Sequence, residues 1–228
     1  MSHSFFAKTG FLALTLGTIV TTPFLNACST TTQNQALPNP SATNAESMQG
    51  TNHPSMGDMN HSTQLELGPA DADFDLRFVD AMIPHHQGAV KMAKEAQQKS
   101  KRPEIQALAA NIIKAQDQEI NQMKQWRQAW YPKASTEPIA YNSKMGHSMP
   151  MSPDQMQGMM MSIDLGAADD QLDLRFLNAM IPHHEGAIKM AQAALSQSKR
   201  PEIQKLAQEI ITSQKAEITQ MQHWKKSW

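Results

Sequence analysis

The sequence predicts an all-α fold, a four-helix bundle built from two copies of one helical hairpin. Residues 75–130 and 173–228 align without a gap at a constant offset of 98, and 34 of the 56 aligned positions are identical. In each copy, apolar residues recur at helical spacing along two successive stretches, and no strand-like alternation competes with this pattern. Four helices of roughly 25 residues each are the usual content of a four-helix bundle.

Prolines mark two kinds of position in each hairpin. Pro103 and Pro201 follow the predicted turns and suit the first position of a new helix. Pro84 and Pro182 fall inside the first helix of each copy, where proline removes one backbone hydrogen bond. At these two positions we expect either a kink or a fresh helix start, immediately before a pair of histidines.

The first 28 residues resemble an export signal. Residues 10–20 form an apolar stretch that is too short to span a bilayer as a stable helix. Residues 25–28 read Leu-Asn-Ala-Cys, which resembles a bacterial lipobox and predicts lipidation of Cys28. We therefore expect an exported, membrane-anchored lipoprotein of the bacterial periplasm, with a plain signal peptide as the alternative.

Composition divides the rest of the chain and excludes some functions. We expect a disordered tether at 29–70, the first repeat at 71–130, a Met-rich linker at 131–168 and the second repeat at 169–228. The formal net charge is −1, without a long run of one sign, which argues against nucleic acid as a partner. Cys28 is the only cysteine, so soft-metal chemistry in the folded part must use methionine and histidine.

Each predicted hairpin brings histidine, thioether and acidic side chains to the same level of the bundle. If the helices run antiparallel, the Met-Ile-Pro-His-His segment lies beside the later Gln-x-x-Glu-x-x-x-Met segment. Neutral imidazole and thioether suit Cu(I) and Ag(I), and each glutamate could bind metal or fix a histidine tautomer. The alternative is that these side chains are core packing. The candidate metal ligands in the helices are Met82, His85, His86, Gln116, Glu119, Met123, Met180, His183, His184, Gln214, Glu217 and Met221.

Methionines also gather outside the predicted helices, where packing explains them poorly. Exposed thioethers are oxidised readily, and flexible Met-x-x-Met and His-x-Met spacings can surround one soft ion. A Met-rich surface that docks a protein partner is the alternative. The candidate ligands in the tether and the linker are His53, Met56, Met59, His61, Met145, His147, Met149, Met151, Met156, Met159, Met160 and Met161.

The two Met-Ile-Pro-His-His segments, with the Gln, Glu, Met and Trp positions that follow, resemble the family named domain of unknown function 305. Matching tryptophans are Trp126 and Trp224. The resemblance covers both repeats and implies a ferritin-like bundle. The Met-rich tether and linker resemble the CopM subgroup, which implies an exported copper-binding protein and a role in copper resistance.

We therefore expect a protein that sequesters or shuttles Cu(I), with Ag(I) as a second ion, and that contacts other copper-handling proteins. One alternative is a ferritin-like metal oxidase, although the chain lacks the Glu-x-x-His motif of di-iron bundles. A further alternative is a module that binds proteins rather than metal. The order of the helices, and whether the two histidine pairs form one site or two, stay open at this stage.

Overall fold

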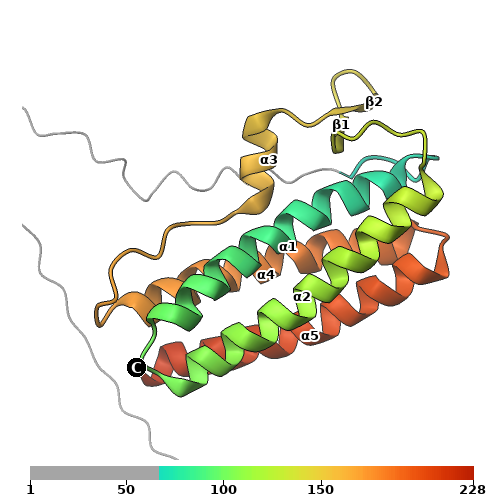
Figure 1. The fold of residues 1–228 in the computed structure, drawn as a ribbon. Coiled ribbons are helices and arrows are strands. Elements are labelled where there is room, and N and C mark those ends of the chain that lie inside the picture. The colour runs from blue at the N-terminus through green and yellow to red at the C-terminus, as the bar shows by residue number, and fades with distance from the viewer. Residues whose placement is uncertain (1–66) are drawn as a thin grey trace, which may run out of the picture. The chain divides into compact units, whose positions relative to one another are not determined.

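The computed structural model describes residues 67–228, in which four long helices pack as a bundle (Figure 1). The first hairpin consists of α1 (Phe74–Lys99) and α2 (Pro103–Trp130), and the second of α4 (Leu172–Gln197) and α5 (Pro201–Ser227). The all-α, four-helix prediction is therefore confirmed. The expected leader and tether, with Cys28 and the candidate ligands His53, Met56, Met59 and His61, lie outside the described residues.

The prolines that follow the turns begin helices, as the sequence predicts. Pro103 and Pro201 each occupy the first turn of the second helix of their hairpin. The inner prolines Pro84 and Pro182 do not end a helix, because α1 and α4 each run through their proline without interruption.

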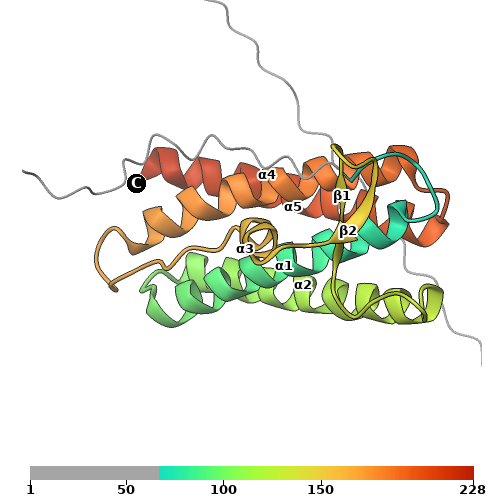
Figure 2. The ribbon, with the colours of Figure 1, turned by 90° about the horizontal axis from the view of Figure 1, so that it is seen from above.

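Contacts at the ends of the bundle fix how the hairpins are arranged. At one end, Arg102 lies 3.3 Å from the carboxylate of Asp173 and 4.0 Å over the ring of Trp228. This places the start of α2 beside the start of α4 and the end of α5. The equivalent contacts at the opposite end are made by Arg200, Asp75 and Trp130. Consequently α1 and α4 are neighbours that run antiparallel (Figures 1 and 2).

The apolar interior is divided into two cores, one toward each end of the bundle. The first core joins residues 74–82 of α1 with residues 187–194 of α4 and 203–211 of α5. The second core joins residues 89–96 of α1 with residues 105–112 of α2. Residues 172–180 of α4 also belong to this second core. Between the two cores lies the middle of each helix, where the repeated histidines occur.

The linker is more ordered than its sequence indicates. It forms a two-stranded hairpin, β1 (Ile139–Asn142) with β2 (His147–Pro150), followed by the short helix α3 (Pro153–Met160). The methionine spacings that we expected in a flexible segment outside the helices thus lie partly in a hairpin and a short helix. Ser152 and Gln155 form a reciprocal capping box at the start of α3, and this local signal is sufficient to begin a helix.

Two buried charged side chains of α1 attach this linker to the bundle. The guanidinium of Arg77, fully buried in α1, donates to the carbonyl of Leu67 and to the hydroxyl of Ser148 in β2. Asp80 accepts from the backbone N–H of Ile139 at 2.9 Å and pairs with Arg127. None of the helices between residues 67 and 228 is long and apolar enough to cross a membrane.

Candidate functional site

A layer of buried polar side chains separates the two apolar cores. Four histidines and two glutamines belong to it, and each is at most 3% exposed. They come from all four long helices, since each hairpin contributes two adjacent histidines from its first helix and a glutamine from its second. We call this set the polar layer, and its members are His85, His86, Gln116, His183, His184 and Gln214, with Glu119 and Glu217 at its edge.

His85 and His183 meet across the boundary between the two hairpins. Their rings stack with centroids 3.8 Å apart and planes 20° from parallel. The Nε2 atom of His85 lies 2.9 Å from the carbonyl oxygen of His183, so this contact joins α1 directly to α4. The two equivalent histidines of the repeats therefore form one pair at the α1–α4 seam.

His86 and His184 instead face the second helix of their own hairpin. His86 donates from Nε2 to the carboxylate of Glu119 at 2.6 Å, and His184 donates to Glu217 at the same distance. The two glutamate side chains remain 18% and 20% exposed, so each reaches from the polar layer to the surface. The sequence-based geometry is thus right for these histidines and their glutamates.

The same geometry was wrong for His85 and His183, which we expected beside α2 and α5. Successive residues on a helix point about 100° apart, so two adjacent histidines cannot both face the same partner helix. In each repeat the second histidine takes the position facing its own hairpin, and the first turns to the seam.

Several polar atoms of the layer have no hydrogen-bond partner within residues 67–228. They are Nδ1 of His86, His183 and His184 and Oε1 of Gln116 and Gln214. When Nε2–H of His86 donates to a carboxylate, the Nδ1 atom of that neutral ring carries a free lone pair. These atoms are therefore the nitrogen and oxygen donors that the layer can offer to an ion.

Burial keeps the seam histidines neutral. Desolvation lowers the pKa of His85 to about 4, although two nearby backbone carbonyls favour its protonated form. Desolvation also holds the pKa of His183 well below its ordinary value, and the neighbouring histidines His85 and His184 add to this effect. Both rings are therefore metal-competent bases at neutral pH.

The end of α3 closes the seam from above (Figure 2). The Nδ1 atom of His85 lies 2.8 Å from the carbonyl oxygen of Met159, and Nε2 of His183 lies 3.1 Å from that of Met160. This approach requires Gly88, because a Cβ there would lie 1.7 Å from the carbonyl oxygen of Met160. The sequence analysis did not single out Gly88, although a glycine stands two residues after the His-His pair in both copies, at Gly88 and Gly186.

The four candidate methionines of the long helices lie in the apolar cores that border the polar layer, and they do not form one cluster with the four histidines. Met82 and Met123 lie in the first core, and Met180 and Met221 in the second, each with no exposed surface. Each is therefore fully buried on the core side of its histidine pair, where it also serves as packing.

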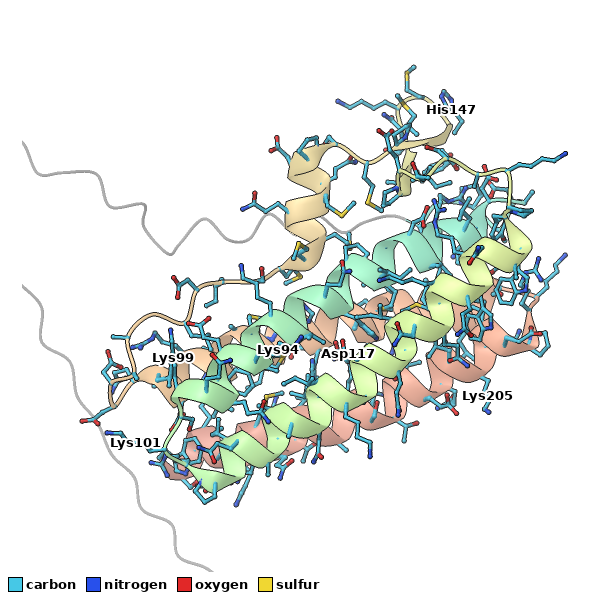
Figure 3. The ribbon with its side chains drawn as sticks, in the orientation of Figure 1. Lys94, Lys99, Lys101, Asp117, His147 and Lys205 are labelled. Atoms are coloured by element: carbon cyan, nitrogen blue, oxygen red, sulfur yellow. The ribbon has the colours of Figure 1, made fainter. Side chains whose placement is uncertain are left out.

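The linker thioethers divide into exposed and buried members. Met145 and Met149 are 60% and 37% exposed on the β-hairpin, and Met161 is 43% exposed after α3. His147 lies at the outer tip of the hairpin (Figure 3). We expected packing to explain these methionines poorly, but it does explain Met159, which is 6% exposed in the first core. Met151 packs partly against the same core, and Met156 and Met160 are half-buried.

Histidines and carboxylates alone do not complete a metal centre in this part of the chain. Between residues 67 and 228, no three side chains of the His, Cys, Asp and Glu types come together in a way that could hold an ion. The carboxylate-rich centre of a di-iron bundle is therefore not formed by these residues. An ion that takes three or more ligands there would need thioether sulfur, amide oxygen or backbone oxygen among them.

Comparison with known proteins identifies the family. The family described as Domain of unknown function (DUF305) matches residues 24–127 and 75–225. The chain belongs to the DUF305 family. The mimivirus protein L153, described as uncharacterized, is 47% identical over 49 residues, which are 22% of this chain and 32% of that protein.

Solved structures of similar proteins match the bundle. CopM in its Cu(II)-bound form is 40% identical, with a TM-score of 0.54, and the match covers 68% of this chain and 97% of that chain. A DUF305 fragment from Deinococcus radiodurans is 27% identical, with a TM-score of 0.55, over 70% of this chain and 99% of the fragment. CopM has also been solved in Cu(I)-bound, Ag-bound and apo forms.

Proposed function

We propose that this DUF305 protein binds Cu(I), and by the same chemistry Ag(I), and that it sequesters or shuttles copper outside the cytoplasm. The observation that carries the proposal is the buried polar layer, in which three imidazole Nδ1 atoms have no partner within the described residues. A buried polar atom without a partner costs about 1–3 kcal/mol. Unpartnered imidazole nitrogens occur in both hairpins. Because each one lowers the stability of the fold, stability does not explain why both hairpins have them.

The donor set fits a soft monovalent ion. Neutral imidazole and thioether are ligands that Cu(I) accepts, and both occur at the layer and around it. Glu119 and Glu217 would act as outer partners, because each accepts the Nε2–H of a histidine and leaves the Nδ1 lone pair for metal. This assigns the glutamates to orientation of the histidines rather than to direct coordination.

The exposed thioethers provide a capture surface. Met145 and Met149 lie on the β-hairpin, whose first strand contacts α1, and Met161 follows α3. Of these three, Met161 is the one beside the seam, because its sulfur and the ring of His85 both lie within 4 Å of the Cβ position of Gly186. We propose that the exposed thioethers bind the copper ion first and that the buried histidines then retain it.

The similarity to CopM supports this proposal. CopM, which has been solved with Cu(I), Cu(II) and Ag, is 37–40% identical in these structures, and the matches cover 96–97% of that chain. Export rests on the leader-like residues 1–28, with Cys28 as the proposed lipidation site. We propose a binding protein rather than an oxidase, and periplasmic copper-handling proteins as its partners.

The proposal is tested by titrating the full chain with Cu(I) under anaerobic conditions against a competing Cu(I) chelator. We expect the protein to remove more than one equivalent of Cu(I) from the chelator. Replacing Met145, Met149 and Met156 together by leucine should lower that number while leaving the fold intact, since these side chains are exposed or half-buried.

Met92→Leu is the matched control, because Met92 is a fully buried thioether of the second core. That variant should bind as much Cu(I) as the original chain. If the full chain cannot take Cu(I) from the chelator, the proposed function is wrong. If the triple leucine variant binds as much as the control, the surface sulfurs are not ligands.

A further inference from the structure

A groove lies between α2 and α5, on the side of the bundle away from α3, which packs on α1 (Figure 1). Its volume is about 200 Å³, which corresponds to roughly seven water molecules at about 30 Å³ each. None of its lining residues belongs to the polar layer or to the candidate metal ligands, so the proposed function does not use it. The lining residues are Gln122, Trp126, Glu202, Lys205, Leu206 and Glu209.

The inner part of the groove is apolar and aromatic. Leu206 is 1% exposed, and Trp126 packs partly against the first core. The ring of Trp126 stacks on that of Trp130 with centroids 5.1 Å apart, and the guanidinium of Arg200 lies 4.3 Å over Trp130. The stacked rings therefore already attract one cation at Trp130, while Trp126 borders the groove.

The rim of the groove carries a net negative charge. Glu202 and Glu209 are exposed and contribute two negative charges, against the single positive charge of Lys205. The ammonium of Lys205 lies 3.8 Å from Glu209, and 78% of the Lys205 side chain is exposed, so water screens this pair. Figure 3 shows Lys205 at the surface of α5. An aromatic ring beside carboxylates favours a cationic ligand.

The repeat offers an internal comparison for this groove. Trp224 is the equivalent of Trp126, whereas the equivalent of Glu209 is the uncharged Asn111. Glu104, the equivalent of the rim residue on the first turn of α5, lies 3.6 Å from a basic side chain, that of the preceding arginine. The tryptophan thus occurs in both repeats, as packing requires, but the free acidic groups beside it do not.

We propose that this groove binds a small organic ammonium ion. The apolar groups of the ligand would lie against Trp126 and Leu206, and Glu202 and Glu209 would neutralise its charge. Tryptophan attracts a cation more strongly than the other aromatic side chains do. A bare metal ion would leave the tryptophan and leucine uncovered, and the rim would repel an anion. This inference is independent of the proposed copper function, because no candidate metal ligand lines the groove.

Choline tests the proposal, because a neutral compound of the same shape exists, in which a tert-butyl group replaces the trimethylammonium group. The full chain is labelled with 15N in its tryptophans, and the Trp126→Phe variant identifies the indole signal of Trp126. We expect choline to shift this signal to saturation and to leave that of Trp224 in place. The neutral compound should bind about fivefold more weakly or less, since it lacks the charge. Potassium chloride at equal concentration is the control for ionic strength.

Variants of the rim separate charge from apolar contact. Replacing Glu202 and Glu209 together by glutamine changes only exposed side chains, so the fold should persist while affinity for choline falls about fivefold. Lys205→Ala removes the like charge and should raise the affinity. The inference is wrong if choline leaves the Trp126 signal fixed or if the neutral compound binds as tightly. Equal shifts of Trp126 and Trp224, or unchanged affinity in the glutamine variant or in Lys205→Ala, would also contradict it.

Discussion

The rings of His85 and His183 stack at a centroid distance of 3.8 Å, although they are equivalent residues of two repeats 98 positions apart. The duplicated sequence thus places its own copies against each other, at the seam between α1 and α4. Because both rings are almost fully buried, charging either one brings a cation next to a second imidazole with little solvent to screen it.

The first prediction concerns pH and the metal-free protein. Burial lowers the pKa of His85 to about 4 in the folded state, whereas the unfolded chain has the ordinary value of 6.5. Between these two values the unfolded state binds more protons, so stability is present above pH 6.5 and is lost as pH falls toward 4. The loss should be about 1.4 kcal/mol per pH unit from this residue, or about 3 kcal/mol in total.

Urea unfolding at pH 7.5, 6 and 5, with a metal chelator present, measures this loss. His85→Gln should have a smaller pH dependence than the original chain, because one titrating ring is removed. His147→Gln is the control, since His147 is exposed at the tip of the β-hairpin. Equal pH dependence in His85→Gln and in the original chain would contradict the account of a neutral, buried pair.

The second prediction concerns the two glycines that follow the histidine pairs. Gly88→Ala would place a methyl carbon 1.7 Å from the backbone of Met160, whereas the equivalent contact at Gly186 is 3.3 Å to a side chain. Overpacking of this kind costs about 1–3 kcal/mol. Gly88→Ala should therefore destabilise the packing of α3 on α1 more than Gly186→Ala does.

Hydrogen exchange of the backbone amides of α3 distinguishes these two variants. In Gly88→Ala we expect faster exchange in residues 153–160 while the amides of α2 and α5 keep their protection. Slower or unchanged exchange in α3 would show that its end does not need Gly88.

The third prediction concerns Glu119. In Glu119→Ala, Nε2–H of His86 loses its partner and stays buried, which should cost about 1–3 kcal/mol. Glu119→Gln keeps an acceptor oxygen and should cost less. If Glu119 orients the ring for metal, Glu119→Ala should also weaken Cu(I) binding by about 10–100-fold.

Glu217→Ala makes the same change in the second repeat, where the contact to His184 has the same length. Thermal unfolding and competition with a Cu(I) chelator measure the two effects separately. A variant that loses stability but binds Cu(I) with the original affinity would restrict Glu119 to a structural role.

The fourth prediction concerns the contacts that join the hairpins at the ends of the bundle. Arg200 lies 3.3 Å from Asp75 and 4.3 Å over the ring of Trp130. Arg200→Ala should lose about 1 kcal/mol in unfolding experiments, because partly exposed ion pairs and cation–π contacts are each worth about that or less. Arg200→Lys should recover little, since lysine lacks the planar fork. A fully stable Arg200→Ala variant would show that these contacts do not hold the hairpins together.

The repeat made most of the fold predictable. Helical spacing and the prolines at 103 and 201 locate both hairpins within a few residues of their observed bounds. The order of the helices was not predictable, because Arg102, Asp173 and Trp228 are distant in sequence and carry no pairing signal. Helix α3 was not predicted, because the capping box of Ser152 and Gln155 that begins it is a local feature inside a Met-rich stretch.

The candidate site was predictable only in part. The hairpin geometry correctly placed His86 beside Glu119, because both belong to one antiparallel pair of helices. The pairing of His85 with His183 depends on which faces of the two hairpins meet, and the sequence of one hairpin does not contain that information. The need for Gly88 depends in turn on where α3 ends.

The central claim, that thioether and imidazole groups together bind a soft ion, is tested most directly by X-ray absorption at the copper edge. The sample is the full chain loaded anaerobically with one equivalent of Cu(I). Our account predicts both sulfur and nitrogen neighbours in the first coordination shell. A shell without sulfur, or a sample in which the copper stays in the buffer, would contradict it.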